Sequence, residues 1–219
     1  MEETAFYLFG FKLMEPGNFI TDIIMAIATY TFYLKLKDDR QNIYFSYFFL
    51  FMALTSFIGG FGHLLFHYTG KPFQVFGWIF SALSIYFIEL AALKEFKSES
   101  FRKKLNFAIN LQFVLFIIIV LFIQNFAVVT TNMIIGIMGL VIPVFSIQAF
   151  QKNRKKNILI ISGLLLSSIP AFLYKLDFDF GGLSGKVVSH LILVLCFYIV
   201  FLGVSVGTET VKEKAVTRS

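Results

Sequence analysis

Long runs of apolar residues, separated by short polar segments, dominate the pattern along this chain. Seven of these runs approach or exceed the roughly 20 residues that a helix needs to cross the hydrocarbon layer of a bilayer. They lie near residues 17–36, 43–67, 73–93, 105–124, 127–149, 157–175 and 187–207. Polar and apolar residues do not alternate within the runs, which favours helices over the strands of a membrane barrel. The sequence therefore predicts an all-α fold, a single bundle of seven transmembrane helices that takes up residues 1–219.

The basic residues lie mostly on one side of this predicted bundle. Fifteen of the nineteen Lys and Arg residues follow the first, third, fifth or seventh run, and only Lys12, Lys71, Lys175 and Lys186 lie on the other side. Because positively charged segments remain in the cytoplasm, the N-terminus is expected outside and the C-terminus in the cytoplasm. Gln124, Asn125 and Phe126 alone separate the fourth and fifth runs, which predicts a tight antiparallel connection.

Composition supports a membrane protein and narrows its partners. Hydrophobic residues make up 58% of the chain and charged residues 15%, against about a quarter charged in soluble domains. We expect a multi-pass integral protein of a bacterial-type inner or plasma membrane, surrounded by membrane lipids, with its first helix retained as an anchor because the N-terminus lacks a basic signal region. The net charge of +6 comes from the orienting loops, so no nucleic-acid partner is predicted. The single cysteine, Cys196, excludes an intramolecular disulfide.

The three histidines of the chain all lie near helix ends on the predicted outer side. His63 and His67 are four residues apart, so on one continuous helix both imidazoles project from the same face. His190 begins the seventh run, and Asp22 lies about two turns into the first. Ionisable residues at membrane depth are functional candidates, so this outer third of the bundle is where we expect the site.

The second run carries a stripe of small and polar residues. Ser56, the pair Gly59–Gly60, His63 and His67 recur at helical spacing among Phe, Leu and Ile. Glycines allow a neighbouring backbone or a ligand to approach closely. The stripe therefore predicts one wall of a polar cavity, with room for a lipid or fatty-acyl ligand in the bundle.

The histidine spacing also suits a zinc centre. Two imidazoles at i and i+4 form a common half-site, and a third from another helix completes a catalytic centre with an open position for water. The predicted metal ligands are His63, His67 and His190, with zinc as the cofactor. Asp22 and Ser56 are the candidate catalytic residues, Asp22 as a fourth ligand, a general base or a group that orients a histidine.

The histidine pair and three acidic residues can also be interpreted without a catalytic role. A histidine pair at the end of a membrane helix also binds interfacial water and lipid headgroups. Glu89, near the inner end of the third run, would extend to the cytoplasmic interface or pair with a lysine. Asp177 and Asp179 either lie over the cavity mouth or belong to an exposed loop.

Three short motifs carry a likeness to a known group of proteins. Residues 15–22 read Glu-Pro-Gly-Asn-Phe-Ile-Thr-Asp and match the pattern Glu-x-x-Asn-x-x-Ser/Thr-His except at the last position. In the same proteins the second helix carries Ser-x-x-x-His, and here His63 stands at the histidine position with Gly59 in place of the serine. Their seventh helix carries Ser-His-x-x-x-His, which Ser189 and His190 match, whereas Val194 replaces the last histidine. In these positions the chain resembles the CREST superfamily, seven-helix membrane proteins that include the progestin and adipoQ receptors and the alkaline ceramidases.

The resemblance implies both an activity and a ligand set. It implies a zinc-dependent amide hydrolase acting on a ceramide-like lipid, with His63 and His190 as ligands and His67 or Asp22 in the place of the missing histidine. The superfamily's aspartate of the third helix has no counterpart near Trp78. We therefore expect a zinc-dependent membrane hydrolase of a lipid or acyl-amide substrate. The alternative is a non-enzymatic receptor, sensor or carrier that binds a lipid, metal or haem in the same cavity.

Overall fold

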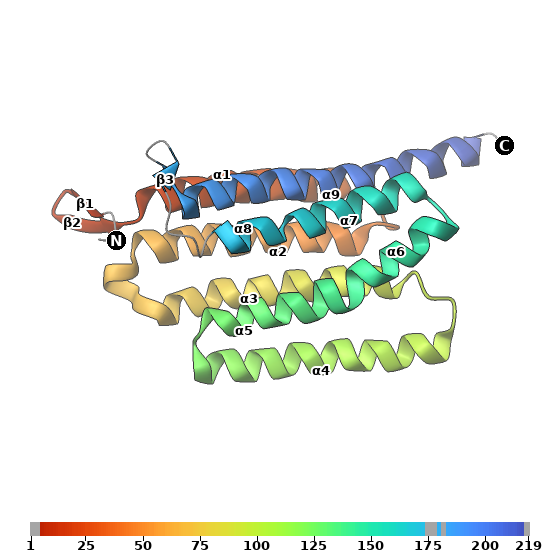
Figure 1. Ribbon diagram of the computed structural model, residues 1–219, viewed down its shortest axis with the longest axis horizontal. Coiled ribbons are helices and arrows are strands. Elements are labelled where there is room, and N and C mark those ends of the chain that lie inside the picture. The colour runs from red at the N-terminus through yellow and green to blue at the C-terminus, as the bar shows by residue number, and fades with distance from the viewer. Residues whose placement is uncertain (1–4, 174–178, 181–182, 217–219) are drawn as a thin grey trace.

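The computed structural model describes residues 5–173, 179–180 and 183–216, and they are mostly helical (Figure 1). The helices are α1 (Pro16–Leu36), α2 (Ile43–Leu64), α3 (Phe66–Leu93), α4 (Glu99–Ile123), α5 (Phe126–Met133), the π-helix η1 (Ile134–Val141), α6 (Ile142–Gln151), α7 (Arg154–Leu166), α8 (Ser168–Leu173) and α9 (Gly185–Val216). Two antiparallel hairpins join β1 (Ala5–Leu8) to β2 (Phe11–Met14) and β3 (Asp179–Phe180) to β4 (Leu183–Ser184). Asp179 belongs to β3, whereas Asp177 lies outside the described residues.

Six helical segments are long and apolar enough to cross a membrane. They are α1, α2, α3, α4, the continuous stretch Phe126–Gln151 and the Gly185–Val206 part of α9. Each coincides with one of the predicted apolar runs, so the lengths and composition of the helices are consistent with an integral membrane protein. The run near 157–175 is different, because α7 and α8 are separated at Ser167 and neither is long enough by itself.

The helices lie side by side, and the ends marked N and C are at opposite ends of the bundle (Figure 1). Helix α1 packs against α2 and α9, α2 packs against α3, and α7 packs against α6 and α9. Helix α4 lies at the edge, against α3 and α5, and shows many apolar side chains on its surface. Neighbours in space thus include the first and last helices of the chain.

Phenylalanine rings fill the main core between α1, α2, α6 and α9. Phe49 and Phe145 are completely buried, and Phe32 stacks on Phe201 with 4.7 Å between ring centres. Such contacts supply packing where lipid removes most of the hydrophobic drive for helices to associate. The buried Phe rings of the apolar runs therefore contribute to holding the bundle together.

The fifth predicted span is interrupted by a π-helix. The eight residues Ile134–Val141 have π-helical winding, which is wider than that of an α-helix, and Pro143 follows in the first turn of α6. Proline has no backbone N–H, so it leaves a carbonyl of the preceding turn without its usual donor and favours irregular winding there. Pro143 is thus preceded by a π-helix that the apolar pattern does not indicate.

The second predicted span ends earlier than the apolar run does. Helix α2 ends at Leu64, and Leu65, with φ −99° and ψ 11°, separates it from α3. Helix α3 then bends again at Gly70, which has φ 59°. The prediction that residues 43–67 form one helix is therefore wrong at its last turn, because the chain turns back there along α2.

Candidate functional site

Polar side chains from α1, α2 and α9 meet at the bundle end that carries the β1–β2 hairpin. This polar cluster consists of Glu15, Asn18, Thr21, Asp22, His63, Lys186 and His190. Its members come from the beginning of α1, the end of α2 and the beginning of α9. Those three ends coincide because α1 and α9 begin where α2 finishes, and α1 packs against both.

Glu15 connects the three helices. Its Oε2 atom accepts hydrogen bonds from His63 Nδ1 at 2.6 Å and from Asn18 Nδ2 at 2.9 Å. Its Oε1 atom accepts a hydrogen bond from the Lys186 ammonium. The Glu15 backbone is left-handed, with φ 43° and ψ 55°, immediately before Pro16. Such strained conformations cost about 1–3 kcal/mol and gather at functional sites, and here the strain accompanies a carboxylate with three donors.

The surroundings of Glu15 keep its carboxyl group ionised. Burial raises the pKa of this carboxyl, but the hydrogen bonds and charges of His63 and Lys186 outweigh burial and lower the pKa to about 2. The side chain is 14% exposed, so these interactions are only partly screened by solvent. Glu15 is therefore an anion at physiological pH, matched by a lysine and an imidazole.

Asp22 and Thr21 hold the other imidazole. His190 Nδ1 lies 3.3 Å from Asp22 Oδ1 and 3.2 Å from Thr21 Oγ1. The Thr21 hydroxyl also lies 3.1 Å from the carbonyls of Gly17 and Asn18, to which it donates. With Thr21 donating elsewhere and the Asp22 carboxylate as an acceptor, Nδ1 of His190 is the proton-bearing nitrogen, which leaves Nε2 with a lone pair.

Close packing between α1 and α2 places Asp22 beside His63. A Cβ atom at Gly60 would lie only 3.0 Å from the Cβ of Asp22. Asp22 is 4% exposed at this contact, and the His63 and His190 rings are 6.3 Å apart between centres. The two imidazoles, each paired with a carboxylate through Nδ1, therefore form one connected site.

Three of the five predicted site residues belong to this cluster. Asp22 orients a histidine, which is one of the three roles predicted for it, and His63 and His190 are neighbours as expected. Ser56 is buried on α2, and its hydroxyl donates to the Met52 carbonyl of its own helix. The contacts of Ser56 do not connect it to the cluster within the part of the chain that the structure describes.

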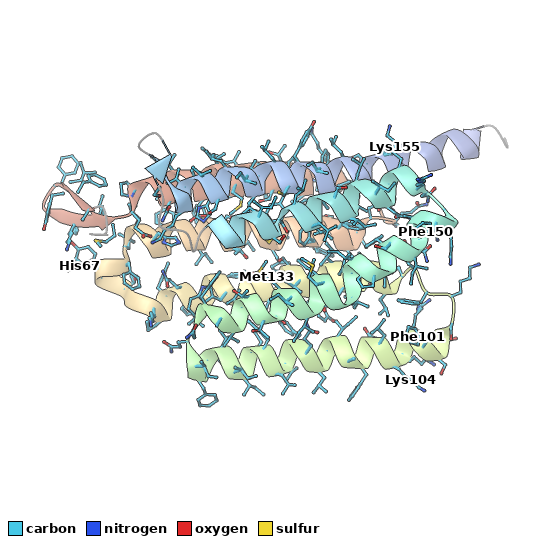
Figure 2. All side chains as sticks on the ribbon, viewed as in Figure 1. His67, Phe101, Lys104, Met133, Phe150 and Lys155 are labelled. Atoms are coloured by element: carbon cyan, nitrogen blue, oxygen red, sulfur yellow. The ribbon has the colours of Figure 1, made fainter. Side chains whose placement is uncertain are left out.

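His67 does not share a helix with His63. It lies on α3 beyond the break at Leu65, where it is exposed and contacts the ring of Tyr68 at 5.0 Å between centres. Figure 2 labels it near the hairpin end, at the edge of the molecule. The prediction that both imidazoles project from one helical face is therefore wrong, because the helix ends between them.

The donor set does not fit the predicted three-histidine zinc centre. Among residues 5–173, 179–180 and 183–216, no group of three or more His, Cys, Asp or Glu side chains has an arrangement that could hold a metal ion. Both oxygens of Glu15 are already occupied, and the Lys186 ammonium adds a positive charge beside it. A divalent cation at this position would be repelled by that charge.

Two members of the cluster, Glu15 and Lys186, are harder to recognise as site residues from the sequence than the histidines and Asp22 are. Glu15 matches a motif position of the CREST resemblance, but it precedes the first apolar run and so is not at membrane depth by that criterion. Lys186 is one of only four basic residues on its predicted side. A lysine at the start of an apolar run, on the side where lysines are rare, is the signal that could have indicated an ion pair with a carboxylate of the bundle.

Comparison with known proteins places the chain in a family. Residues 18–208 match a family of unknown function, DUF6962. The chain belongs to this family. The DUF6962 match includes Asp22, His63, Lys186 and His190, and Glu15 precedes it. No curated protein and no solved structure matches the chain.

Proposed function

We propose that this chain is a membrane-embedded hydrolase that cleaves an acyl-amide or ester bond of a lipid at the polar cluster. The observation that carries the proposal is the meeting of two imidazoles from different helices, 6.3 Å apart between ring centres, each paired with a carboxylate. A carboxylate on Nδ1 fixes the orientation of an imidazole and raises the basicity of its other nitrogen. Ionisable groups at this depth are costly, which favours a functional role over packing.

The proposal includes seven crossings and an outward-facing site. Helices α7 and α8 follow one another beside α9 and together make up the additional crossing (Figure 1). The distribution of basic residues supports an N-terminus outside the cell. The polar cluster then faces the outer leaflet, from which a lipid substrate enters. The motif resemblance to the alkaline ceramidases supports the same substrate class.

In the proposed reaction His190 is the general base. Its Nε2 atom takes a proton from a water molecule, the water oxygen forms a bond to the substrate carbonyl carbon, and Asp22 stabilises the resulting imidazolium. Lys186, which is held by Glu15, places positive charge near the developing oxyanion, and the His63 ring donates through Nδ1 to the same Glu15 carboxylate. The bond from carbon to the leaving nitrogen or oxygen then breaks, and His190 returns its proton to that leaving group. General acid–base steps of this kind contribute about 10²–10⁴-fold in rate.

Hydrolysis of fluorescent lipid amides and esters by the purified full-length protein in lipid vesicles tests this proposal. We expect His190→Ala to lower the rate by about 10²-fold or more, because the base is lost. His67→Ala is the matched control, since this histidine is exposed and outside the cluster, and it should leave the rate unchanged. Equal rates in the two variants would contradict the proposal.

A chelation experiment separates this mechanism from the zinc-dependent one expected from the sequence. We expect activity to survive treatment with EDTA, because the cluster residues perform the proton transfers. Loss of activity that added Zn²⁺ restores would instead support the zinc mechanism. The metal content of the purified protein, measured by mass spectrometry, provides an independent readout.

One observation favours the second candidate, a non-enzymatic receptor or carrier. Both carboxylate oxygens of Glu15 accept hydrogen bonds, from His63, Asn18 and Lys186. These interactions hold the side chain in one position, as expected of a binding site that does not rearrange. Such a protein would retain a lipid through purification without converting it. Recovery of intact lipid with the protein, together with no turnover of any amide or ester tested, would support this function over hydrolysis.

A further inference from the structure

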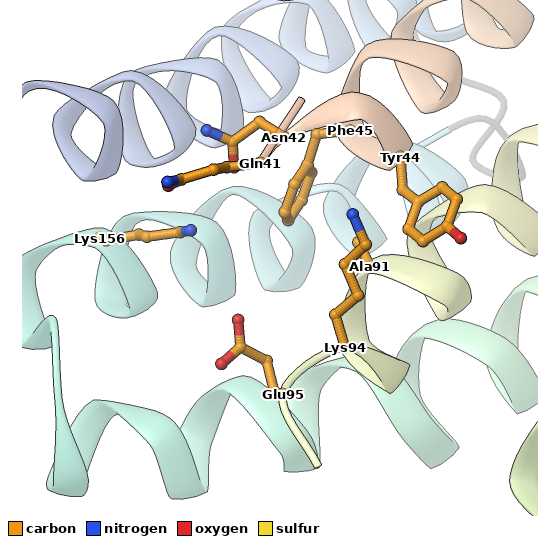
Figure 3. A pocket seen from close by; sticks show the side chains of 8 residues that line it. All are labelled: Gln41, Asn42, Tyr44, Phe45, Ala91, Lys94, Glu95 and Lys156. Carbon is orange, nitrogen blue, oxygen red and sulfur yellow. The ribbon is translucent and has the colours of Figure 1, made fainter. Parts of the chain in front are cut away.

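A second polar site lies at the other end of the bundle, where α2 begins and α3 ends. It is a pocket of about 30 Å³, lined among others by Gln41, Asn42, Tyr44, Lys94 and Lys156 (Figure 3). Gln41 and Asn42 directly precede α2, and Tyr44 lies in its first turn. Lys94 follows α3, and Lys156 belongs to α7. Three segments that are distant in the sequence thus contribute donors to one pocket.

The two lysines have no carboxylate partner. Within the described part of the chain, neither Lys94 nor Lys156 forms an ion pair, and each instead lies over an aromatic ring. Lys94 Nζ is 4.3 Å from the centre of the Tyr44 ring, and Lys156 Nζ is 6.0 Å from that of Phe45. Cation–π contacts hold an ammonium in place but leave its positive charge uncompensated.

The acidic groups nearby are already engaged. Glu95, which also lines the pocket, pairs with Lys152 at 3.1 Å. Asp39 interacts electrostatically with Lys156. It already accepts hydrogen bonds from the backbone of Gln41 and the side chain of Asn42. The charged side chains that line the pocket are therefore two lysines and one carboxylate, Glu95, so the pocket retains positive charge.

The size of the pocket and its place in the fold favour a lipid phosphate over other anions. A space of about 30 Å³ holds roughly two water molecules, enough for phosphoryl oxygens but not for a complete headgroup or an acyl chain. The pocket lies where α1 ends, α2 begins and α3 ends, which is the level at which phosphates lie beside membrane spans. Basic pockets between membrane helices bind anionic headgroups in this way.

We propose that this pocket binds the phosphate of an anionic phospholipid, with Lys94 and Lys156 as its charged ligands and Gln41 as an amide donor. The acyl chains of the lipid would lie along the outside of the helices, and only the phosphoryl oxygens would enter. The site is separate from the polar cluster, and it does not depend on the hydrolase proposal.

Binding of phosphatidylglycerol and phosphatidylcholine to the full-length protein in detergent, followed by native mass spectrometry, tests this site. We expect preferential retention of phosphatidylglycerol, and an affinity weakened about tenfold or more in the Lys94→Gln, Lys156→Gln double variant. Lys155→Gln is the matched control, because Lys155 is exposed and does not line the pocket. It should bind as the unaltered protein does.

Three outcomes would overturn the proposal. These are unchanged lipid preference in the double variant, an equal loss in Lys155→Gln, and stabilisation by inorganic phosphate without any preference between the two lipids, which would assign the pocket to a soluble anion. If the double variant does not fold, the single variant Lys94→Gln is used in its place, because Lys94 is exposed and its replacement should not affect folding. We expect this variant also to bind phosphatidylglycerol more weakly than the unaltered protein does. Arginine at both positions should restore binding, since it retains the charge.

Discussion

At the scale of single residues, Glu15 and Glu99 each pair with a lysine but differ in which helices the pair stabilises. Glu15 is 14% exposed and receives three donors from α1, α2 and α9, whereas Glu99 is 75% exposed and pairs only with Lys103 in its own helix. Solvent screens the second pair almost completely. Glu15 therefore contributes to the assembly of three helices, and Glu99 to little beyond one helical turn.

Replacing Glu15 by Gln removes the charge while preserving the shape of the side chain. We expect a loss of stability of about 2–4 kcal/mol, below the full cost of breaking a buried ion pair because Lys186 retains contact with solvent. Glu99→Gln should cost less than about 0.5 kcal/mol. The midpoints of thermal unfolding in detergent measure the difference, and similar midpoints for the two variants would contradict the role assigned to Glu15.

At the scale of elements, close contact between helix backbones fixes how α7 packs on α9. A Cβ atom at Gly163 would lie 2.7 Å from the carbonyl oxygen of Cys196 and 2.9 Å from the backbone nitrogen of Val200. Backbone atoms cannot yield as a flexible side chain does, so only glycine fits there. Gly139, by contrast, has nothing within 4 Å of an added Cβ.

The pair Gly163→Ala and Gly139→Ala tests this contact. We expect the first substitution to destabilise the protein by about 1–3 kcal/mol, because α7 and α9 must separate. The second should be tolerated, since the added methyl group meets open space. Thermal unfolding with circular dichroism follows both variants, and a tolerated Gly163→Ala would show that the two helices adjust their distance easily.

The limits of prediction from sequence also lie at this scale. The apolar runs predict the long helices well, because a segment in lipid must satisfy its own backbone hydrogen bonds. The break at Leu65 has no such signal, since Leu64 to Phe66 are as apolar as the helix before them. The apolar pattern therefore places His67 on the same helix as His63, whereas in the structure it lies on α3. Asp22, His63 and His190 are recognisable in the sequence because ionisable residues at membrane depth are costly and therefore rare.

At the scale of the whole molecule, the arrangement of the ends bears on topology. The first and last helices pack together and run in the same direction, so the two ends of the chain lie at opposite ends of the bundle (Figure 1). The seven crossings proposed above are compatible with this arrangement, because an odd number of crossings puts the two ends of a chain on opposite sides. The Glu15 interactions could not be predicted, because Glu15 precedes the first apolar run and so is not marked as an ionisable residue at membrane depth.

Cysteine labelling tests the proposed topology. Cys196 is the single cysteine and is buried, so a Cys196→Ala background accepts one new cysteine at a time. With the N-terminus outside, Lys71→Cys should react with a membrane-impermeant maleimide in intact cells, and Lys155→Cys only after lysis. Labelling of both positions in intact cells, or of Lys155→Cys alone, would reject the orientation.

The pairing of Glu15 with Lys186 has a consequence for biosynthesis. During translation Glu15 enters the membrane region first, and its lysine partner follows 171 residues later. Asn18, three residues away, is available first, and His63, 48 residues away, is the first partner from another helix. The polar cluster is therefore completed only when the last helix is inserted, so a prematurely terminated chain carries an unassembled site.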